Sequence, residues 1–380
     1  MIKKYTDFDL TARNTFRMKV RCALYVEVTE EADLPALDWS LLPQPILVLG
    51  GGSNLLFTRD FPGTVLHLAI RTAPQLHEEK PGEVLVTVGA GVVFDDFCAW
   101  AAGEGLWGPE NLSLIPGECG ASAVQNIGAY GVEVKDILAD IRAWDRLESR
   151  LVHISPASCA YGYRRSNFKT AWKGRYIITA VTYRLSRDPR PVLDYGGVRK
   201  ALEEKGVSTY PEISGHPRPD KREGPAAEGS GRGRSEAEAI SGYVLTPQIL
   251  RETIIGIRRA KLPDSAEVGS AGSFFCNPVI SREHFHRIEA IARADNGPDY
   301  RVPHYDTPDG IKVPAAWMIE QCGFKGKRLG GAQVYQNQPL VIVNASGTAT
   351  PEDILGLERQ VIAAVSDKYA ITLSPEVEHI

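Results

Sequence analysis

One hydroxyl side chain stands out because of its neighbours. Ser273 follows a glycine and precedes two phenylalanines in AGSFFCNP, which runs from Ala271 to Pro278 and includes Asn277. Aromatic neighbours keep water away from a hydroxyl, and a glycine lets another group approach the backbone closely. By itself the stretch fits a buried strand in which Ser273 bonds a carbonyl, the usual fate of a buried polar group. A chemical role for Ser273 needs support from other parts of the chain.

Two glycine-rich stretches have the composition of phosphate-binding loops. In GGGSN, from Gly50 to Asn54, three glycines can turn successive backbone N–H groups into one concavity, and Ser53 adds a side-chain donor. A plain glycine turn between two strands is the alternative. The second stretch, IPGECGASAVQNIGAYG from Ile115 to Gly131, combines glycines, alanines and small hydroxyls with almost no charge. Such a loop suits a large flat ligand and its phosphates.

Two other motifs are weaker. The sequence contains no G-x-x-x-x-G-K-[ST], which excludes a P-loop of that type. GAGVVF lies between strand-like and helix-like segments, as a dinucleotide fingerprint would, but Phe94 replaces its third glycine. A dehydrogenase that uses only a nicotinamide cofactor stays open on this motif. YGYRRSNFK brings Tyr163, Arg164 and Lys169 close together, although a lone arginine is more often a solvated charge.

The segments that must position these residues alternate between strands and helices. ILVLGGGSNLLF predicts a strand, a turn and a second strand, and EVLVTVGAGVVF repeats the arrangement. From Phe94 onward the spacing predicts a helix, with Phe97 and Ala101 on the same side. RYIITAVTYRL alternates, which predicts a strand with one solvent-exposed face.

Two later helices have explicit start signals. Thr246 can cap a helix whose first residue is Pro247, and Thr350 and Pro351 repeat this pattern before two acidic residues. The closing segment, AITLSPEVEHI, predicts a terminal strand. The overall class is α+β. The predicted buried face of the last helix consists of Ile354, Leu357, Val361 and Val365.

Length, charge and hydropathy restrict the class of protein. A chain of 380 residues suggests two or three domains, and 43% hydrophobic with 24% charged residues is ordinary for a globular protein. A net charge of −4 without a basic run argues against nucleic acid or an anionic membrane as partner. The N-terminus lacks the apolar segment of a signal peptide, and the longest apolar runs are strand-sized. We therefore expect a cytoplasmic protein without membrane insertion.

Cysteines, histidines and one biased segment complete this picture. The six cysteines form no C-x-x-C pair, which argues against disulfides or zinc and for a reducing compartment. His284 and His286 would point to different faces of a helix, so we predict no metal site. The stretch from Gly215 to Ala239 is rich in proline, glycine and charge and nearly lacks large apolar residues. We predict that residues 206–241 are a disordered insertion, easily proteolysed and dispensable for activity.

Taken together, the motifs resemble those of the UDP-N-acetylenolpyruvoylglucosamine reductases, enzymes that make UDP-N-acetylmuramate for peptidoglycan. The matching landmarks run from NTF at Asn14 to LSPEV ending at Val377, which is nearly the whole chain in the family's order. Any one motif is weak evidence, but seven in register are strong. They are GGGSNLL, IPG…GAS…QNIGAYG, YGYR.S.FK, KLPD, GSFF.NP, P.AWMIEQCG.KG…GG and the closing PEV.

The resemblance implies a fold and two cofactors. The fold would be an FAD-binding fold of the vanillyl-alcohol-oxidase (PCMH) type in two subdomains, with a separate α+β substrate-binding domain. The first subdomain would comprise 1–70 with a strand from 370–380, the second 71–205, and the substrate domain 242–369. The cofactors implied are FAD and NADPH. By position, FAD would be held by Gly50, Gly51, Gly52, Ser53, Asn54, Gly117, Gly120, Ala121, Ser122, Gln125, Asn126, Gly128 and Ala129.

The resemblance also implies the reaction. NADPH would reduce the flavin, and flavin N5 would deliver hydride to the enolpyruvyl ether of UDP-N-acetylglucosamine, leaving a carboxylate-stabilised carbanion. Family position makes Ser273 the proton donor, because a carbanion accepts a proton from an alcohol and a neutral donor survives a dry pocket. Arg164 would face the carboxylate where charge builds up. Glu376 would complete the site as a protonated acid.

Some positions concern the substrate, and others depart from the family pattern. By the same resemblance Tyr163, Tyr195, Lys261 and Asn277 would bind the UDP-sugar. None of the three catalytic positions is altered. Separately, we expect a monomer, because nothing in the sequence suggests an exposed apolar interface. At four positions this sequence departs from the residue that the family usually has. Cys276 stands where lysine is usual, Ala316 where glycine is usual, Ser374 where an acidic residue is usual, and Glu378 where arginine is frequent.

Two rival interpretations concern related proteins. One is an oxidase of the same flavin fold, but many of these attach flavin through a histidine, and the two glycine-rich stretches contain none. The other is a catalytically inactive protein that binds nucleotide sugars. Such a protein would not need Ser273, Arg164 and Glu376 together, and all three are present.

Overall fold

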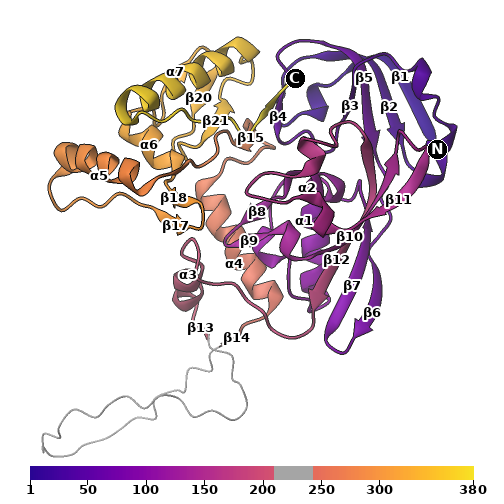
Figure 1. Ribbon diagram of the computed structural model, residues 1–380, viewed down its shortest axis with the longest axis horizontal. Coiled ribbons are helices and arrows are strands. Elements are labelled where there is room, and N and C mark those ends of the chain that lie inside the picture. Colours follow the sequence, from indigo (N-terminus) through magenta and orange to yellow (C-terminus); the bar gives the residue numbers. More distant parts are fainter. Residues whose placement is uncertain (209–242) are drawn as a thin grey trace, which may run out of the picture.

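The computed structural model describes residues 1–208 and 243–380 (Figure 1). The predicted disordered insertion, 206–241, therefore lies outside the described residues from position 209 onward. At its two ends, β13 (Val207–Ser208) and β14 (Tyr243–Val244) pair in parallel. The chain thus leaves and re-enters the described structure on neighbouring strands.

The N-terminal part is built on a four-stranded sheet. Its order is β1-β2-β5-β3, with β1 antiparallel to β2 and with β2, β5 and β3 parallel. The glycine turn follows β3 and leads into β4 (Leu55–Leu56), which pairs in parallel with the C-terminal β22 (Glu378–His379). The sheet strands are β1 (Ile2–Asp9), β2 (Arg21–Val28), β3 (Ile46–Val48) and β5 (Phe61–Leu68).

The prediction of a strand throughout the last eleven residues is wrong for most of that segment. Only Glu378 and His379 are in a strand. Pro375 lacks the N–H that a ladder needs, and it makes only an isolated antiparallel bridge with Phe275. Ladder pairing starts three residues later.

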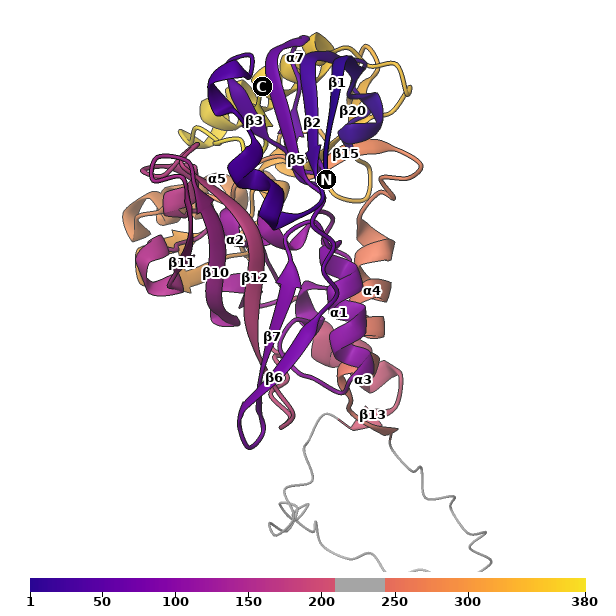
Figure 2. The ribbon, with the colours of Figure 1, turned by 90° about the vertical axis from the view of Figure 1, so that its right-hand side faces the viewer.

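A second, antiparallel sheet lies below the first in the view of Figure 2, in the order β11-β10-β12-β7-β6. Helices α1 (Phe94–Gly103) and α2 (Cys119–Gln125) contribute to its buried core. Phe97 stacks on Tyr183 of the sheet with ring centroids 4.4 Å apart, and Phe94, Phe97 and Ala101 are buried as predicted. The strands are β6 (Gln75–Lys80), β7 (Glu83–Gly89), β10 (Leu138–Asp145), β11 (Arg150–Ile154) and β12 (Tyr176–Ser186).

The prediction of a solvent-exposed face on β12 is confirmed only for its second half, where Thr182 is partly exposed and Arg184 is exposed. This strand lies in the middle of the second sheet, and its residues 177–181 are all buried. Val181 belongs to the core shared with α1 and α2, whereas Ile177 packs with Trp144 and Leu66 against the first sheet. The first half of the strand therefore has a buried environment on each side.

The C-terminal part combines helices with two small sheets, orange to yellow in Figure 1. Its helices are α4 (Pro247–Lys261), α5 (Arg282–Asn296), α6 (Ala315–Gln321) and α7 (Pro351–Tyr369). One sheet has the order β15-β21-β20-β19, comprising β15 (Gly269–Ser273), β19 (Arg328–Leu329), β20 (Ala332–Val334) and β21 (Val341–Asn344). The other has the order β16-β18-β17, comprising β16 (Val279–Ile280), β17 (Tyr305–Thr307) and β18 (Gly310–Lys312). Further short elements include β8 (Gly128–Ala129), β9 (Val132–Glu133) and α3 (Val198–Glu204).

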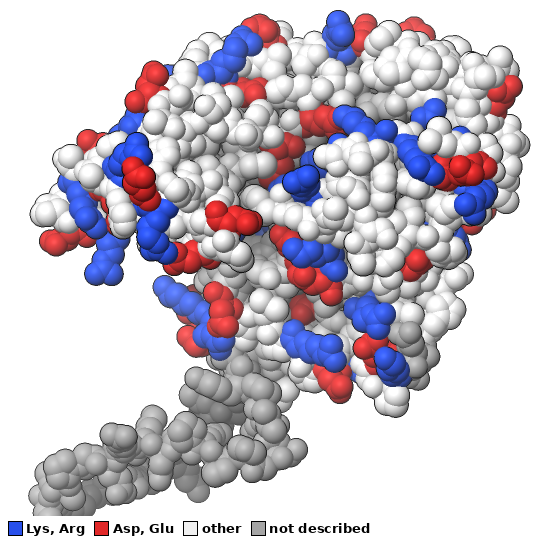
Figure 3. All heavy atoms as spheres, in the orientation of Figure 1, with Lys and Arg blue, Asp and Glu red and all other residues white. Residues whose placement is uncertain are grey.

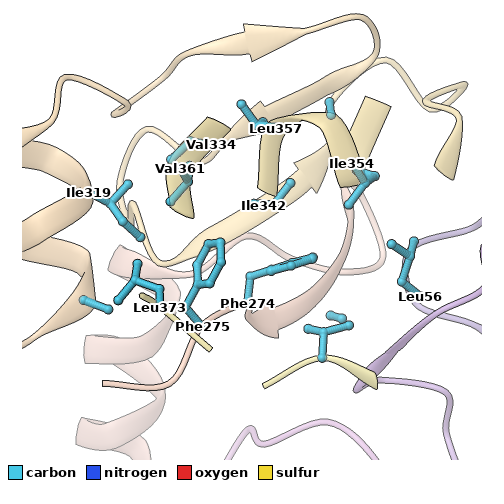
Figure 4. Close-up of a cluster of buried hydrophobic side chains, with 14 of the residues drawn as sticks. Leu56, Phe274, Phe275, Ile319, Val334, Ile342, Ile354, Leu357, Val361 and Leu373 are labelled. Carbon is cyan, nitrogen blue, oxygen red and sulfur yellow. The ribbon is translucent and has the colours of Figure 1, made fainter. Parts of the chain in front are cut away.

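Both predicted helix starts are confirmed. Thr246 accepts a hydrogen bond from Ile249 N, and Thr350 forms a capping box with Asp353. The predicted face of α7 is buried against the aromatic pair that follows Ser273, as Figure 4 shows for Phe274 and Phe275. These two rings hold the end of β15 in the core.

The surface is mixed in charge. On the face shown in Figure 3, basic and acidic side chains are interspersed over the elements. Within the described residues, no helix is long and apolar enough to cross a membrane, and no group of three His, Cys, Asp or Glu side chains is placed to hold a metal.

Candidate functional site

A cavity of about 890 Å³ is lined by all three parts of the molecule. The first sheet contributes β3 and the glycine turn, the second contributes α2 and its flanking loops, and the C-terminal part contributes the ends of α4, β15 and the last segment. This volume is in the range of cofactor and substrate sites. The two glycine-rich stretches that the sequence singled out therefore form one site.

All but one of the residues predicted to hold FAD line this cavity. They are Gly50, Gly51, Gly52, Ser53, Asn54, Gly117, Gly120, Ala121, Ser122, Gln125, Gly128 and Ala129. Ser122 also bonds Cys119 O, at 2.6 Å, and Tyr183 Oη, at 3.0 Å, so its hydroxyl has protein partners.

Asn126 is the exception. It ends α2 in the left-handed region, with φ 45°, and is fully buried. Its Nδ2 donates to Glu133 Oε2 and to Gly162 O, and its Oδ1 accepts from Lys135 N. The side chain therefore fixes the loop that carries Arg164, and it does not line the cavity.

The glycine turn needs glycine because the backbone around it is crowded. Gly52 has φ 63°, and a Cβ there would overlap the carbonyl oxygen of Arg13. A Cβ on Gly51 would lie 3.1 Å from Gly117 Cα. The two glycine-rich stretches therefore touch each other and present bare backbone to the cavity.

Arg164 is held by a strained turn. Gly162 and Arg165 exchange backbone hydrogen bonds, and Arg164 between them has φ 54°. Its Nη2 donates to Gly128 O at 2.9 Å, and its Nε lies 2.7 Å from Glu376 Oε1. The guanidinium thus joins the α2 loop to the C-terminal segment inside the cavity.

Glu376 and Ser273 are brought together by backbone pairing. Glu376 N donates to Phe274 O, and Cys276 N donates to Ser374 O, so the segment after Ser273 runs beside the segment before β22. Both side chains line the cavity. In the part of the chain that the structure describes, Ser273 Oγ has no hydrogen-bond partner, so the carbonyl bond of the simpler interpretation is not found.

The environment of Glu376 favours its neutral form more than water would. Burial raises the pKa of Glu376, whereas the positive charges of Arg164 and Lys169 act in the opposite direction. Lys169 itself donates to Gln125 Oε1, at 3.1 Å, and Asn54 also reaches this oxygen, at 3.3 Å. The glycine turn, α2 and the loop after Arg164 are therefore linked by one set of hydrogen bonds.

The predicted substrate residues divide into two pairs. Tyr195 and Lys261 line the cavity. Tyr163 and Asn277 are not among its lining residues: Tyr163 is 41% exposed, and Asn277 accepts a hydrogen bond from Ala315 N at the start of α6. Tyr163 directly precedes the lining residue Arg164.

One of the departures from the family pattern, Glu378, lines the cavity, and a second, Cys276, lies near Glu376. Glu378 pairs with Lys173, which lines the cavity too. Burial raises the pKa of the Cys276 thiol, as does the charge of nearby Glu376. Nothing in the structure explains alanine at position 316, whereas Ser374 contributes its carbonyl to the pairing described above.

Several lining residues were missed by sequence reasoning. Arg258 is three residues before Lys261 on α4 and so shares its helix face, a signal that could have found it. Its Nη2 makes one long bond, 3.4 Å, to Leu114 O. No sequence signal pointed to Tyr305, since a hairpin from the C-terminal part brings it there. The missed residues include Glu118, Lys173, Arg258, Tyr305 and Gln338.

Two family models match the chain. One is described as an FAD binding domain and covers residues 23–155; the other is the C-terminal domain of UDP-N-acetylenolpyruvoylglucosamine reductase and covers 264–380. The fold and site are thus those of a protein that binds FAD and carries a second, C-terminal domain. A crystal structure of the reductase from Thermus caldophilus shares this fold, with a TM-score of 0.61 and 20% identity over 100% of this chain and 98% of that one.

Relatives in sequence identify the family. The UDP-N-acetylenolpyruvoylglucosamine reductase of Bacteroides fragilis is 39% identical over 98% of this chain and 99% of its own length. The protein of the same name from Chromobacterium violaceum is 40% identical over 97% of each chain. The chain belongs to the family of UDP-N-acetylenolpyruvoylglucosamine reductases, which confirms the resemblance and the fold class expected from it.

Proposed function

We propose that this protein is an FAD-dependent reductase that uses NADPH to convert UDP-N-acetylenolpyruvoylglucosamine into UDP-N-acetylmuramate, a peptidoglycan precursor. The observation that carries the proposal is the meeting of Ser273, Arg164 and Glu376 in the cavity that the glycine-rich stretches line. Family membership supports the same reaction. A cytoplasmic location and a monomeric state remain part of the proposal.

The residues present fit FAD. The bare backbone of Gly51 and Gly117 leaves room for phosphates and their N–H partners, and Ser53 and Asn54 offer polar side chains beside them. The apolar residues Val48, Leu68 and Ile178 line the cavity as well, which suits flat rings. When bound, FAD supplies the hydride that NADPH has delivered to it.

Ser273 is proposed as the proton donor to the substrate carbon that becomes a carbanion. Its hydroxyl has no protein partner within the described structure and is therefore free to bond the substrate. It follows Gly272, whose φ of 70° turns the end of β15. The donor must be neutral at rest, and an alcohol is.

Arg164 and Glu376 are proposed to stabilise the charge on the substrate. Each terminal nitrogen of the guanidinium carries two N–H groups, so the pair can bind the substrate carboxylate in a fork while the second N–H of each keeps its carbonyl partner. Glu376, when protonated, can donate to the enolate oxygen. Tyr163, Tyr195, Lys261 and Asn277 are proposed to hold the UDP-sugar, with Asn126 acting on the site through the Arg164 loop.

The anaerobic visible spectrum tests the proposal. The purified holoenzyme should show a flavin spectrum that NADPH bleaches and that the enolpyruvyl UDP-sugar restores. A protein that takes up FAD but is not reoxidised by this substrate would contradict the reaction. A protein that takes up no FAD would favour the nucleotide-sugar-binding alternative.

A further inference from the structure

A buried histidine holds a carboxylate at the wall of the cavity. His67 lies on β5 and is only 3% exposed, and its Nε2 is 2.9 Å from Glu118 Oε1. On the other side of the ring, Nδ1 is 2.9 Å from Tyr25 Oη. Burial raises the pKa of Tyr25 to about 12, so this hydroxyl keeps its proton and donates it to Nδ1 in a hydrogen bond. The N–H of the ring is then on Nε2, which donates to Glu118.

The other carboxylate oxygen of Glu118 lies beside the glycine turn. Glu118 lines the cavity, and a Cβ built on Gly50 would lie 3.3 Å from its Oε2. Across residues 1–208 and 243–380, this oxygen accepts no hydrogen bond. Glu118 is also the N-cap residue of α2, yet its side chain does not cap the helix. The carboxylate therefore has an acceptor oxygen left for a ligand.

Glu118 lies at the end of α2 that is remote from the reacting groups. Helix α2 extends from its N-cap, Glu118, to its last residue, Gln125, a length of about 10 Å at 1.5 Å per residue. Asn54 Nδ2 reaches Gln125 Oε1 and also donates to Glu376 O. The glycine turn thus begins beside Glu118 and ends beside Glu376. A cofactor with its flavin near Glu376 and its diphosphate on the turn would bring its adenosine half toward Glu118.

We propose that Glu118, positioned by His67, binds the ribose hydroxyls in the adenosine half of FAD. The proposal rests on the proposed function, because it assigns a residue to the cofactor of that reaction. A carboxylate accepts hydrogen bonds and donates none, so it suits hydroxyl groups and repels phosphates. In Rossmann dinucleotide sites a carboxylate binds a ribose hydroxyl in the same way. His67 acts through Glu118, because its hydrogen bond fixes where the carboxylate lies.

The test uses two competitors of FAD uptake that differ only in the ribose hydroxyls. ADP carries both hydroxyls, and 2′,3′-dideoxy-ADP carries neither. Each is titrated against FAD uptake by the full chain freed of its flavin, and the quenching of flavin fluorescence reports the uptake. Glu118→Ala removes the carboxylate. Glu358→Ala is a matched control, because Glu358 also contacts a histidine, with His379 Nε2 at 3.2 Å, but does not line the cavity.

We expect the wild type and Glu358→Ala to bind ADP about tenfold more tightly than the dideoxy form, the effect of hydrogen bonds to a charged acceptor. In Glu118→Ala this preference should fall to about twofold or less, and the Kd for FAD should rise roughly tenfold. His67→Leu should reduce the preference in the wild-type background and have no further effect in the Glu118→Ala background. Each preference compares two ligands on one protein, so partial misfolding of a variant does not affect it.

Three results would overturn the proposal. They are equal binding of ADP and the dideoxy form by the wild type, a preference that survives in Glu118→Ala, and an equal loss of preference in Glu358→Ala. An unaltered preference in His67→Leu would overturn the positioning role of His67. A wild-type protein that takes up no FAD would instead contradict the proposed function.

Discussion

The proposed proton donor sits on a backbone that other contacts hold in place. Ser273 ends β15, and the phenylalanines after it are fixed in the core under α7. Ser273→Ala should therefore leave the fold and the bleaching of flavin by NADPH unchanged. Reoxidation by the UDP-sugar should fall by at least about a hundredfold, the typical contribution of a positioned acid. Stopped-flow absorbance of the two half-reactions measures this.

A neighbouring serine provides the control. Ser270 lies on the same strand, is buried and does not line the cavity. Ser270→Ala should reoxidise like the wild type. Equal losses in both variants would mean that the strand, and not the Ser273 hydroxyl, limits the reaction.

A second residue-scale prediction concerns a carboxyl outside the cavity. Glu110 is only 3% exposed, and burial raises its pKa to about 7. The unfolded chain then releases this proton at lower pH than the folded chain, so the wild type loses stability as pH rises from about 4.5 to 7. Glu110→Gln removes that loss. The free energy of unfolding of the variant relative to wild type should rise by roughly 2 kcal/mol between pH 5 and pH 8.

Chemical denaturation at several pH values measures this difference. In the Glu110→Gln variant, the side-chain amide oxygen can still accept the hydrogen bond that Gly108 N gives to Glu110 Oε2. Glu104→Gln, at an exposed carboxyl just after α1, should show no such trend. If the free energies of unfolding of Glu110→Gln and wild type differed by the same amount at all pH values, Glu110 would not change its protonation state in this range.

At the scale of elements, the glycine turn after β3 leaves no room for a side chain at Gly52. Gly52→Ala forces a side chain into a positive-φ position against the Arg13 carbonyl. We expect it to weaken FAD binding at least tenfold, measured by the quenching of flavin fluorescence. Gly256→Ala should instead raise the free energy of unfolding, because Gly256 lies inside α4 with open space around it. That helix should gain about 1 kcal/mol without any change in FAD affinity.

Elements with local signals were predictable from the sequence. The starts of α4 and α7 follow from a threonine–proline pair, and the buried face of α1 from its spacing, since both depend only on neighbours in sequence. The first half of β12 was misjudged because its second face packs against the first sheet, whose strands lie far away in the chain. The motifs identified Arg164 and Glu376, but their contact depends on two long-range pairings. Tyr305 could not be found because a hairpin alone decides where its ring lies.

At the scale of the whole molecule, one cavity is shared by three parts, so its ligand should stabilise all of them together. FAD at a hundred times its dissociation constant should add about 2.7 kcal/mol to the free energy of unfolding and raise Tm in a single transition. Riboflavin lacks the phosphates and should stabilise much less if the glycine backbone holds them. Differential scanning calorimetry of the FAD-free and loaded protein measures both. Two separate transitions, only one of which moves with FAD, would contradict a shared site.

The parallel pairing of β13 and β14 limits how the segment between them can be replaced. A tight two-residue turn joins antiparallel strands only, whereas here the chain must return from the end of Ser208 to the start of Tyr243. Each strand is two residues long, about 7 Å, so a flexible linker of roughly four to six residues can make the return. A shortened protein for crystallisation should therefore carry such a linker in place of residues 209–242, since a direct fusion of the two strands would pull this ladder apart.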